Sequence, residues 1–520
     1  MKATISDKNG NALFHSNGYA VFNMDGSVMP NGDGLYTTSM PAFYPFGPPV
    51  PMSMMALPRP GHDNDYYLIH LEWGPGWWDR QKLVISLITN AAVSGQGSVA
   101  WKNRALFDKG HWLEFFQATK HANGRDWWIV LSDADSITQL RTFYSFFIGT
   151  DTAYLASTQY IDGYEPVPPV WKNGTWQRIF SPDGKYLLTL DLSSGIHLHT
   201  FDRCSGLLGP LKTIPYTKWG AGYGAIVVSS NSRFLYLSTT YAILQYDLAV
   251  QDGILSADTI GIYDGFMDTL FGVKYPTWIG LGQHGPDGKI YYMSSTRIHY
   301  IAKPNKIGKA CDFIQHRLKM PTYAQFPLYY PNYRLGPLDG SPCDTLGLNN
   351  EPLADFWWFT DSTLTVEFAD NSFYEPALWY WDFGDGGGSQ DTNPAHTFPA
   401  PGIYTVCLTV SNQYAADTVC KQVQVGVTTS MPGLGKKSSR LNIRPNPAQD
   451  KVSIQLPSTG MDAGRLEIFD AHARLQHSIK AFQGISEIEV STAGWLTGIY
   501  FCRLITDGQA VITGKFLVQH

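Results

Sequence analysis

The stretch WYWDFGDGGG, residues 379–388, combines residue types that could bind a metal ion or a phosphate group. Asp382 and Asp385 lie three positions apart beside a run of glycines, and carboxylates are ligands that calcium prefers. A phosphate loop is disfavoured, because GDGGGS lacks the lysine and helix that should follow it. An aspartate in a tight turn also accepts hydrogen bonds from backbone N–H groups. We therefore expect both carboxylates to stabilise a turn, with calcium binding as the alternative.

A second set of potential metal ligands, His111, Glu114 and His121, has a spacing that suits no helix. The aromatic residues between them are typical of core packing, so we expect no metal there. No nucleophile elbow, HExxH motif or P-loop occurs in the chain. The sequence thus predicts no catalytic residue, no enzyme, and no cofactor apart from the calcium alternative.

The loop WGPGWWDR, residues 73–80, is the strongest candidate for ligand binding. Trp73, Trp77 and Trp78, beside glycine and proline, could stack on sugar rings or anchor a protein partner. The alternative is that these side chains cover the side of the domain, and the general burial of aromatic residues favours it.

Length and composition limit the classes of protein that need considering. A chain of 520 residues is too long for one core and predicts several domains. Its net charge of −6 disfavours nucleic-acid binding, which usually requires a basic face. Aromatic residues make up 14% of the chain, and with 50 glycines and 32 prolines they indicate short strands and tight turns. No apolar run approaches the ~20 residues of a membrane-spanning helix.

A polar turn followed by an apolar strand recurs through residues 1–345. Its copies are SDKNGNALF (6–14), SPDGKYL (181–187), SSNSRFL (229–235) and GPDGKIY (285–291). Such turns join the strands of hairpins, and the last three copies begin 48 and 56 residues apart. This spacing predicts a β-propeller of about six to seven blades, the first incomplete. Asp7, Asp183 and Asp287 belong to different blades, so we expect them around a ring, each stabilising its own turn.

Two further all-β domains follow the predicted propeller. Residues 346–427 and 441–520 each alternate strands and turns over a length that fits one small, immunoglobulin-like β-sandwich. The residues between them, 428–440, are small, polar and basic, as in a linker. The predicted fold class is therefore all-β: a propeller and two sandwiches.

The middle domain resembles a PKD domain. The resemblance is carried by VEFADNS (366–372), WYWDFGDGGGS (379–389) and NPAHTFPAPGIYTVCLTVSN (393–412). It implies an immunoglobulin-like sandwich in which the turn motif is structural. The motif residues here are Trp381, Asp382, Phe383, Gly384, Asp385 and Gly386, of which the two aromatic residues would fill the core.

The C-terminal domain resembles the type A sorting domain of proteins exported by the type IX secretion system of Bacteroidetes-type bacteria. The matching segments are LNIRPNPAQDKVSIQLP (441–457), VSTAGWLTGIYFCRL (490–504) and GKFLVQH (514–520). Their key positions are Pro445, Asn446, Pro447, Gly498, Tyr500 and Lys515. The resemblance implies passage across the outer membrane by the type IX machinery, followed by release or by attachment to surface lipopolysaccharide.

The propeller region resembles the N-terminal domains that often accompany these two modules. The shared segments are ISDKNGNALFHSNG (5–18), VMPNGDGL (28–35), KHANGRDWWIV (120–130), FDRCSG (201–206), PNKIGKAC (304–311) and YRLGPLDGSPCDTLG (333–347). That family begins with a signal peptide further upstream. We therefore expect Met1 to lie inside a blade and a signal peptide to be encoded before it.

Strand register predicts one disulfide bond. The strands IYTVCLTV (403–410) and DTVCKQVQV (417–425) flank one turn, and the midpoint of Cys407 and Cys420 falls inside it. Both thiols then lie opposed on one face, which permits a cross-strand disulfide. Cys502 alternates with apolar neighbours and should be a buried free thiol.

The other three cysteines, Cys204, Cys311 and Cys343, allow one pair and one free thiol. Their pairing stays open from sequence, with Cys311–Cys343 slightly favoured.

These observations predict an exported protein, secreted or attached to the outer-membrane surface, that binds or adheres. The propeller would be the platform for a glycan or protein ligand, and the PKD domain a spacer. The alternative is a secreted hydrolase or lyase whose active site lies in the propeller channel.

Overall fold

The structure is a computed structural model in which strands and turns make up nearly all of the described chain. It describes residues 3–7, 10–36, 54–73, 81–91, 97–108, 116–134, 141–163, 175–191, 195–215, 224–249, 257–270, 273–294, 296–319, 330–360, 363–426, 441–455, 463–470, 475–482, 487–506 and 509–519. In these ranges the one helix is a short 3-10 turn, η1 (Gly308–Cys311). No helix there is long and apolar enough to cross a membrane.

Two compact units make up the chain. The first contains Met1–Phe359, Val366–Pro399 and Ile403–Val423, and the second contains Thr360–Thr365, Ala400–Gly402 and Gln424–His520. The first unit holds the N-terminal sheets and most of the middle sandwich, and the second holds the C-terminal sandwich.

Six antiparallel sheets follow one another in the N-terminal region, and we call them blades 1 to 6. Blade 1 is β1 (Ala3–Ser6), β2 (Ala12–Ser16) and β3 (Val21–Asn23); blade 2 is β4 (Met54–Pro58), β5 (Tyr66–Trp73), β6 (Gln81–Thr89) and β7 (Ser98–Phe107); blade 3 is β8 (Gln117–Lys120), β9 (Trp127–Ala134), β10 (Arg141–Ile148) and β11 (Ala153–Ile161). Blade 4 is β12 (Thr175–Phe180), β13 (Tyr186–Asp191), β14 (Gly195–Asp202), β15 (Leu207–Leu208) and β16 (Lys212–Ile214); blade 5 is β17 (Ala225–Val228), β18 (Phe234–Ser238), β19 (Ala242–Asp247) and β20 (Asp258–Ile262); blade 6 is β23 (Gly282–His284), β24 (Ile290–Met293), β25 (Arg297–Ile301) and β26 (Phe313–Lys319). A hairpin of β21 (Met267–Leu270) and β22 (Val273–Pro276) joins blades 5 and 6.

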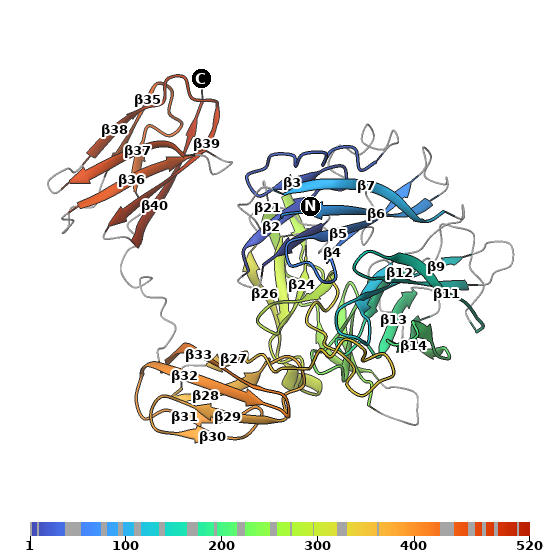
Figure 1. Cartoon of the computed structure of the whole chain (residues 1–520). Helices are drawn as coiled ribbons and strands as arrows, with labels where there is room; N and C mark the ends of the chain where they lie inside the picture. The colour runs from blue at the N-terminus through green and yellow to red at the C-terminus, as the bar shows by residue number, and fades with distance from the viewer. Residues whose placement is uncertain are drawn as a thin grey trace. The chain divides into compact units, whose positions relative to one another are not determined.

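The six blades form a β-propeller. Each blade is a meander in which every strand pairs with its neighbour along the chain, apart from the short strands at the edge of blade 4. The first strands of successive blades lie beside one another, as β1 does with β4 and β8, β12, β17 and β23 do in turn. Figure 1 shows the colour passing from blue through teal to green as the chain moves from blade to blade. The first strands therefore surround a central channel.

The predicted hairpin turns join the first and second strands of their blades. In SPDG, SSNS and GPDG the fourth residue is Gly184, Ser232 or Gly288, and all three have a positive φ, of 71°, 57° and 70°. Glycine adopts this conformation without a Cβ penalty, which explains its use in two of the three turns.

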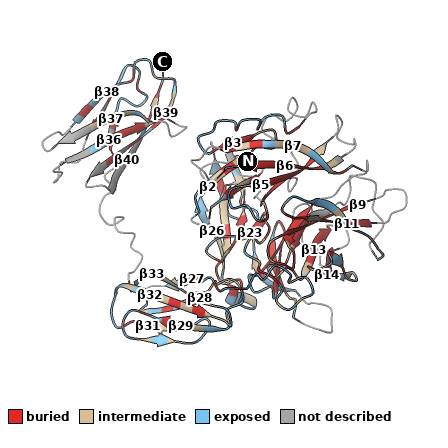
Figure 2. Ribbon diagram, viewed as in Figure 1, coloured by how far each residue is buried: buried red, intermediate tan, exposed pale blue. Residues whose placement is uncertain are grey.

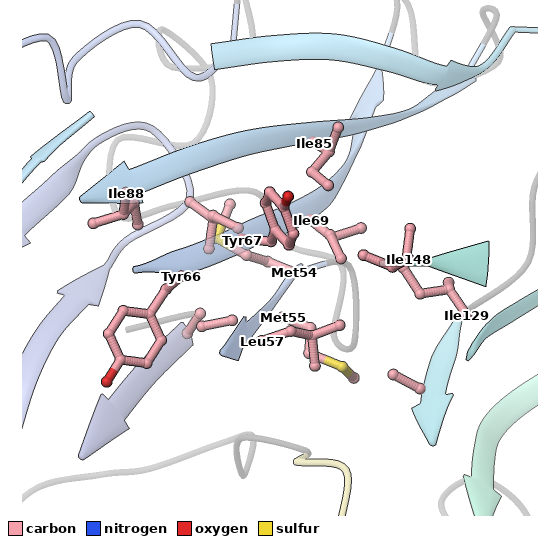
Figure 3. Packing of buried hydrophobic residues seen from close by; sticks show 14 of the residues in the cluster. Met54, Met55, Leu57, Tyr66, Tyr67, Ile69, Ile85, Ile88, Ile129 and Ile148 are labelled. Carbon is pink, nitrogen blue, oxygen red and sulfur yellow. The ribbon is translucent and has the colours of Figure 1, made fainter. Parts of the chain in front are cut away.

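Apolar side chains between neighbouring blades form the propeller core. In Figure 3, Ile69 and Ile85 of blade 2 lie near Ile129 and Ile148 of blade 3. All four are almost fully buried, and Figure 2 shows the same inner strands largely in red. Burial of each such side chain contributes about 1.5–3 kcal/mol, so packing between blades holds the ring together.

Two β-sandwiches follow the propeller. The middle one pairs the sheet of β27 (Phe356–Thr360), β28 (Thr365–Asp370) and β31 (Ala395–Thr397) with that of β29 (Leu378–Asp382), β30 (Gly388–Ser389), β32 (Gly402–Ser411) and β33 (Ala416–Val425). The C-terminal one pairs β34 (Asn442–Arg444), β35 (Lys451–Gln455) and β38 (Glu487–Ser491) with β36 (Ala463–Phe469), β37 (Leu475–Phe482), β39 (Gly498–Thr506) and β40 (Gln509–Val518). The predicted linker, 428–440, lies outside the described residues.

Residues 330–350, which we call the strap, run from the propeller toward the middle sandwich and are fastened to blades 3 and 4. The N–H of Leu338 donates to the carbonyl of Ala122 at 2.7 Å. The guanidinium of Arg203 donates to the carbonyl of Gly336 at 2.5 Å. A disulfide joins Cys204 to Cys343.

The sequence-based preference for Cys311–Cys343 is therefore wrong. Cys311 is a free, fully buried thiol in the core of blades 5 and 6, beside Tyr236. The turn that carries Cys204 lies against the strap, where the neighbouring Arg203 donates to the carbonyl of Gly336. The other two expectations agree with the structure: Cys407 is bonded to Cys420, and Cys502 is buried and forms no disulfide bond.

Candidate ligand-binding site

Exposed apolar side chains gather on the propeller where blades 5 and 6 meet. Tyr241 and Trp278 are 43% and 42% exposed, and the other members are exposed to a similar degree or more. We call this set the aromatic patch; it consists of Tyr241, Ile262, Phe266, Met267 and Trp278. All five lie in turns or at strand ends rather than in the middle of a strand.

Backbone and ring contacts join the connections that carry the aromatic patch. The rings of Tyr241 and Trp278 are 6.4 Å apart and inclined at 74°. The N–H of Tyr263 donates to the carbonyl of Tyr241 at 2.7 Å, and that of Thr277 donates to the carbonyl of Phe266 at 3.3 Å. Hydrogen bonds thus join three connections that are distant in sequence.

His316 of β26 contacts the connections that carry the aromatic patch. Its Nε2 lies 2.9 Å from Oδ1 of Asp264, and its Nδ1 lies 2.9 Å from the hydroxyl of Thr277. The ring of Phe266 stacks on the imidazole with centroids 4.7 Å apart. The order Asp–His–Thr resembles a nucleophile relay, but Thr277 is fully buried and no substrate can reach it. The arrangement is therefore positional: the side chain of His316 holds two connections in place, the one between β20 and β21 and the one between β22 and β23.

The electrostatics of this network favour a charged Asp264 beside a neutral His299. Partial burial acts to raise the pKa of Asp264, but the N–H of Phe266 and the hydrogen bond and charge of His316 outweigh it, so the pKa is lowered. Burial first, and the charge of His316 second, lower the pKa of His299 to about 4. The patch thus offers one anionic acceptor among aromatic rings.

A cavity in the propeller channel is the second candidate site. Its wall includes residues from the first strands of blades 1, 3, 4, 5 and 6, among them Gln117 and Gln177, and also charged residues of the turns and of the strap, such as Asp183, Arg203 and Arg334. Lys120 lies at its mouth, where its ammonium donates to the carbonyl of Arg125 at 3.0 Å and sits 3.9 Å from the centroid of the Trp127 ring. Burial lowers the pKa of Lys120 to about 7, partly offset by the charge of Asp126.

Ionisable side chains also meet between blades 3 and 4. Nη2 of Arg178 donates to the hydroxyl of Ser132 at 2.7 Å, and Nη2 of Arg141 lies 3.8 Å from Oδ2 of Asp191. These side chains are at most a few per cent exposed. Because solvent does not reach them, they link blades rather than present reacting atoms.

Of the three predicted stacking tryptophans, Trp73 is the one that lies in a described range. Trp73 ends β5, where its backbone pairs with Gln81. Trp77 and Trp78 lie outside the described residues.

Two of the three potential metal ligands, His111 and Glu114, also lie outside the described residues. The third, His121, is buried and accepts a hydrogen bond from the N–H of Asn123 at 3.0 Å, as a turn residue does. Among the described residues no group of three or more His, Cys, Asp or Glu side chains is placed to hold a metal ion.

The WYWDFGDGGG turn has the hydrogen bonds of a structural motif. Oδ1 of Asp382 accepts from the N–H of Gly384, and Oδ1 of Asp385 accepts from that of Gly387, both at 2.9 Å. Oδ2 of Asp385 lies 2.8 Å from Nε2 of His396. Gly384 and Gly386 have a positive φ, and Trp381 and Phe383 are buried. A carboxylate that already pairs with a histidine is a poor calcium ligand.

The sorting-motif residues lie near the beginning and near the end of the C-terminal sandwich in sequence, and these two segments contact each other. Oδ1 of Asn446, which lies between Pro445 and Pro447, accepts from the N–H of Leu517 at 2.8 Å. Tyr500 is buried and donates to the carbonyl of Leu496 at 2.8 Å. The remaining two residues are Gly498, which begins β39, and Lys515, which is exposed and pairs with Phe501.

Family comparison identifies two of these modules. Residues 359–427 match the PKD domain, and residues 442–519 match the secretion system C-terminal sorting domain. The chain contains a PKD domain and a C-terminal secretion sorting domain. The sorting domain marks it as an exported protein, secreted or attached to the cell surface, that engages the type IX secretion machinery.

Solved structures give further similarities. The PKD1 domain of Vibrio anguillarum Epp is 34% identical over 15% of this chain and 99% of that chain, with a TM-score of 0.15. The PKD1 domain of the Vibrio cholerae metalloprotease PrtV is 27% identical over 15% and 99%, with a TM-score of 0.14. The periplasmic gluconolactonase PpgL of Pseudomonas aeruginosa is 10% identical over 82% and 99%, with a TM-score of 0.30. No curated protein matches the chain.

Sequence reasoning missed the aromatic patch. Its signal was the same as that of WGPGWWDR, namely aromatic residues beside turn formers, as in Thr240–Tyr241, Gly265–Phe266 and Thr277–Trp278. Each pair is isolated in sequence, so nothing in the pattern indicated that the three meet.

Proposed function

We propose that the protein is an exported binding protein whose propeller holds a glycan at the aromatic patch. The observation that carries the proposal is the exposure of Tyr241, Phe266 and Trp278 in three connections of the propeller that hydrogen bonds join. Exposed apolar patches of this kind mark interaction sites. Aromatic faces bury the apolar face of a sugar ring, and Asp264 supplies an acceptor for its hydroxyl groups.

In this proposal the other two modules determine where the protein is placed. The PKD domain is a spacer, and the sorting domain directs export and then attachment to surface lipopolysaccharide. Binding therefore takes place at the cell surface or outside the cell.

The rival function is a hydrolase or lyase in the propeller channel. Two carboxylates of the cavity wall, Asp7 and Asp183, give it little support, because they accept hydrogen bonds in their own turns. Asp7 accepts from the N–H of Asn11 at 2.8 Å, and Asp183 accepts from that of Lys185 at 3.1 Å.

Glycan-array screening followed by calorimetry on the full chain tests the proposal. We expect Trp278→Ala to weaken glycan binding about tenfold or more, which corresponds to about 1.4 kcal/mol. Tyr160→Ala is the matched control, because Tyr160 is an exposed aromatic residue of blade 3, 71% exposed, outside the patch. Unchanged affinity in Trp278→Ala, or a wild-type protein that binds a protein ligand and no glycan, would overturn the proposal.

A further inference from the structure

The first strand of the PKD domain, β27, carries aromatic side chains on both of its faces. Side chains alternate along a strand, so Trp357 and Phe359 lie on the face opposite to that of Phe356. Phe356 is fully buried in the domain core, where its ring lies 5.1 Å from that of Trp381. The rings of Trp357 and Phe359 lie 5.1 Å from each other on the outward face, and both residues are partly buried. We call these two rings the outer aromatic pair of β27.

Blade 6 of the propeller contacts the outer aromatic pair. Nζ of Lys289 lies 5.7 Å from the centroid of the Trp357 ring, and Nζ of Lys303 lies 4.9 Å from that of Phe359. Lys303 also forms an ion pair with Glu367 of β28, with Nζ and Oε2 2.6 Å apart. An ammonium group within about 6 Å of a ring centroid is attracted to the ring face. All of these residues belong to the first compact unit of the chain.

The turn between β23 and β24 approaches β27 so closely that it requires a glycine. A Cβ at Gly288 would lie 2.2 Å from Cζ2 of Trp357. Gly10, in the corresponding turn of blade 1, has a similar positive φ but nothing within 4 Å of its Cβ position. The lack of a side chain at Gly288 therefore serves the contact with the PKD domain as well as the turn.

The strap connects the PKD domain to the propeller a second time. The amide of Asn350, which is 2% exposed, donates to the carbonyl of Pro337 at 3.0 Å. The amide of Asn412, in the turn between β32 and β33, donates to the carbonyl of Asn350 at 2.5 Å. The guanidinium of Arg334 lies 4.5 Å from the centroid of the Phe373 ring. Because the strap is bonded to blades 3 and 4, the PKD domain is connected to these blades as well as to blade 6.

The PKD domain also forms part of the wall of the channel cavity. This cavity is lined by first strands of the propeller, by the turns that follow them, and by residues 367–375 and 392–395 of the PKD domain. The first strands of a propeller run in the same direction around the channel, so the turns that follow them surround one mouth. The PKD domain therefore lies at that mouth.

We propose that the PKD domain is a fixed lid on this mouth of the propeller channel, held in place by the outer aromatic pair of β27 and by the strap. A polymeric ligand then cannot enter the channel through this mouth. The inference goes beyond the proposed function, in which the PKD domain only separates the propeller from the sorting domain. The alternative is a domain that moves freely on its connection.

Zero-length carbodiimide cross-linking of the full chain, followed by peptide mass spectrometry, tests the lid. The reagent joins a lysine to a carboxylate without a spacer, so it should link Lys303 to Glu367. Lys451 and Glu489 provide an internal standard, because they lie 3.0 Å apart on paired strands of the C-terminal sandwich. Their link forms whether or not the PKD domain is held on the propeller. We expect both links in the wild-type chain.

Removal of the outer aromatic pair should release the lid. In the double variant Trp357→Ala, Phe359→Ala we expect the yield of the Lys303–Glu367 link, relative to the standard, to fall at least about tenfold, because two buried ring surfaces leave the contact. Tyr380→Ala is the matched control, since Tyr380 is an aromatic residue on the other sheet of the same domain and is 57% exposed. It should keep the wild-type yield.

Gly288→Ala tests the same contact from the propeller side and replaces the double variant if that variant does not fold. It should lower the relative yield, whereas Gly10→Ala should not, because no atom lies near the added methyl group. The proposal is overturned if the wild type gives the standard link without the Lys303–Glu367 link. It is also overturned if the double variant and Gly288→Ala keep the wild-type yield, or if the two control variants lower it equally.

Discussion

At the scale of single residues, the two aspartates of the PKD turn have different environments despite equivalent hydrogen bonds to glycine N–H groups. Asp382 has that bond alone among those described, whereas Asp385 also pairs with His396. The imidazole of His396 in turn stacks on Phe383 with centroids 4.0 Å apart. Partial burial acts to raise the pKa of Asp385, but His396 and the N–H of Gly387 outweigh it and lower the pKa. Asp385 thus connects the turn to the core.

This difference predicts a pH-dependent contribution to stability. The pKa of Asp385 is lower in the folded state than in the unfolded chain, so its carboxylate stabilises the fold above about pH 4 and loses that effect as pH falls through the folded pKa. We expect Asp385→Asn to lose about 1–3 kcal/mol at pH 7 and to show a smaller further loss between about pH 5 and pH 2 than the wild type. Urea unfolding followed by tryptophan fluorescence measures both.

Asp382→Asn is the control for that measurement. It removes a similar turn carboxylate without a histidine partner, so it should cost less and leave the acid dependence as in the wild type. Equal acid sensitivity of Asp385→Asn and the wild type would contradict the assignment.

At the scale of elements, the strap shows how a segment without regular structure is fixed by its contacts. It lies against the turn between β8 and β9, where Gly124 has a φ of +76°. A Cβ at Gly124 would lie 2.6 Å from the backbone nitrogen of Pro337. The close approach of two backbones requires glycine there, in addition to the backbone conformation.

Gly124→Ala should therefore lower the unfolding temperature of the propeller and loosen the strap. Gly26→Ala separates the two causes, since Gly26 has a φ of +86° but nothing within 4 Å of its Cβ position. We expect Gly26→Ala to cost about 1 kcal/mol from the backbone alone, and Gly124→Ala to cost clearly more. Differential scanning calorimetry measures the unfolding temperature of both variants. Equal decreases would contradict a steric role for the close approach of Gly124 to Pro337.

The elements also show what sequence can predict. The turns at 181–184, 229–232 and 285–288 were predictable because their residue types are local requirements of a hairpin. The disulfide Cys407–Cys420 was predictable from register within one hairpin. The pairing of Cys204 with Cys343 and the meeting of Tyr241 with Trp278 were not, because each depends on how distant connections pack, which no local pattern encodes.

At the scale of the whole molecule, the domains that are proposed to determine location are different from the one that is proposed to recognise a ligand. The motifs that are easiest to recognise, in the PKD and sorting domains, are those that fold or export the chain. The proposed recognition surface lies in the propeller, where residue types vary from blade to blade. The fold class and the place of action could thus be predicted from sequence, whereas the binding residues required the structure.

Export should depend on the C-terminal sandwich. In the native host, removal of residues 441–520 should leave the protein inside the outer membrane, because the remaining modules contain no sorting motif that we recognise. Protease shaving of intact cells with immunoblotting of the periplasmic fraction measures this. Asp382→Asn should reach the surface as the wild type does, and surface exposure of the truncated chain would contradict the prediction.

The bond between Cys204 and Cys343 has a further consequence for a protein outside the cell. It encloses the chain from the turn between β14 and β15 of blade 4 through blades 5 and 6 to the strap, a sequence separation of 139 residues. A single proteolytic cut anywhere in that covalent loop breaks the chain without separating its two parts. Blades 5 and 6, which bear the aromatic patch, therefore stay tethered to the sorting domain and to the rest of the ring after such a cut.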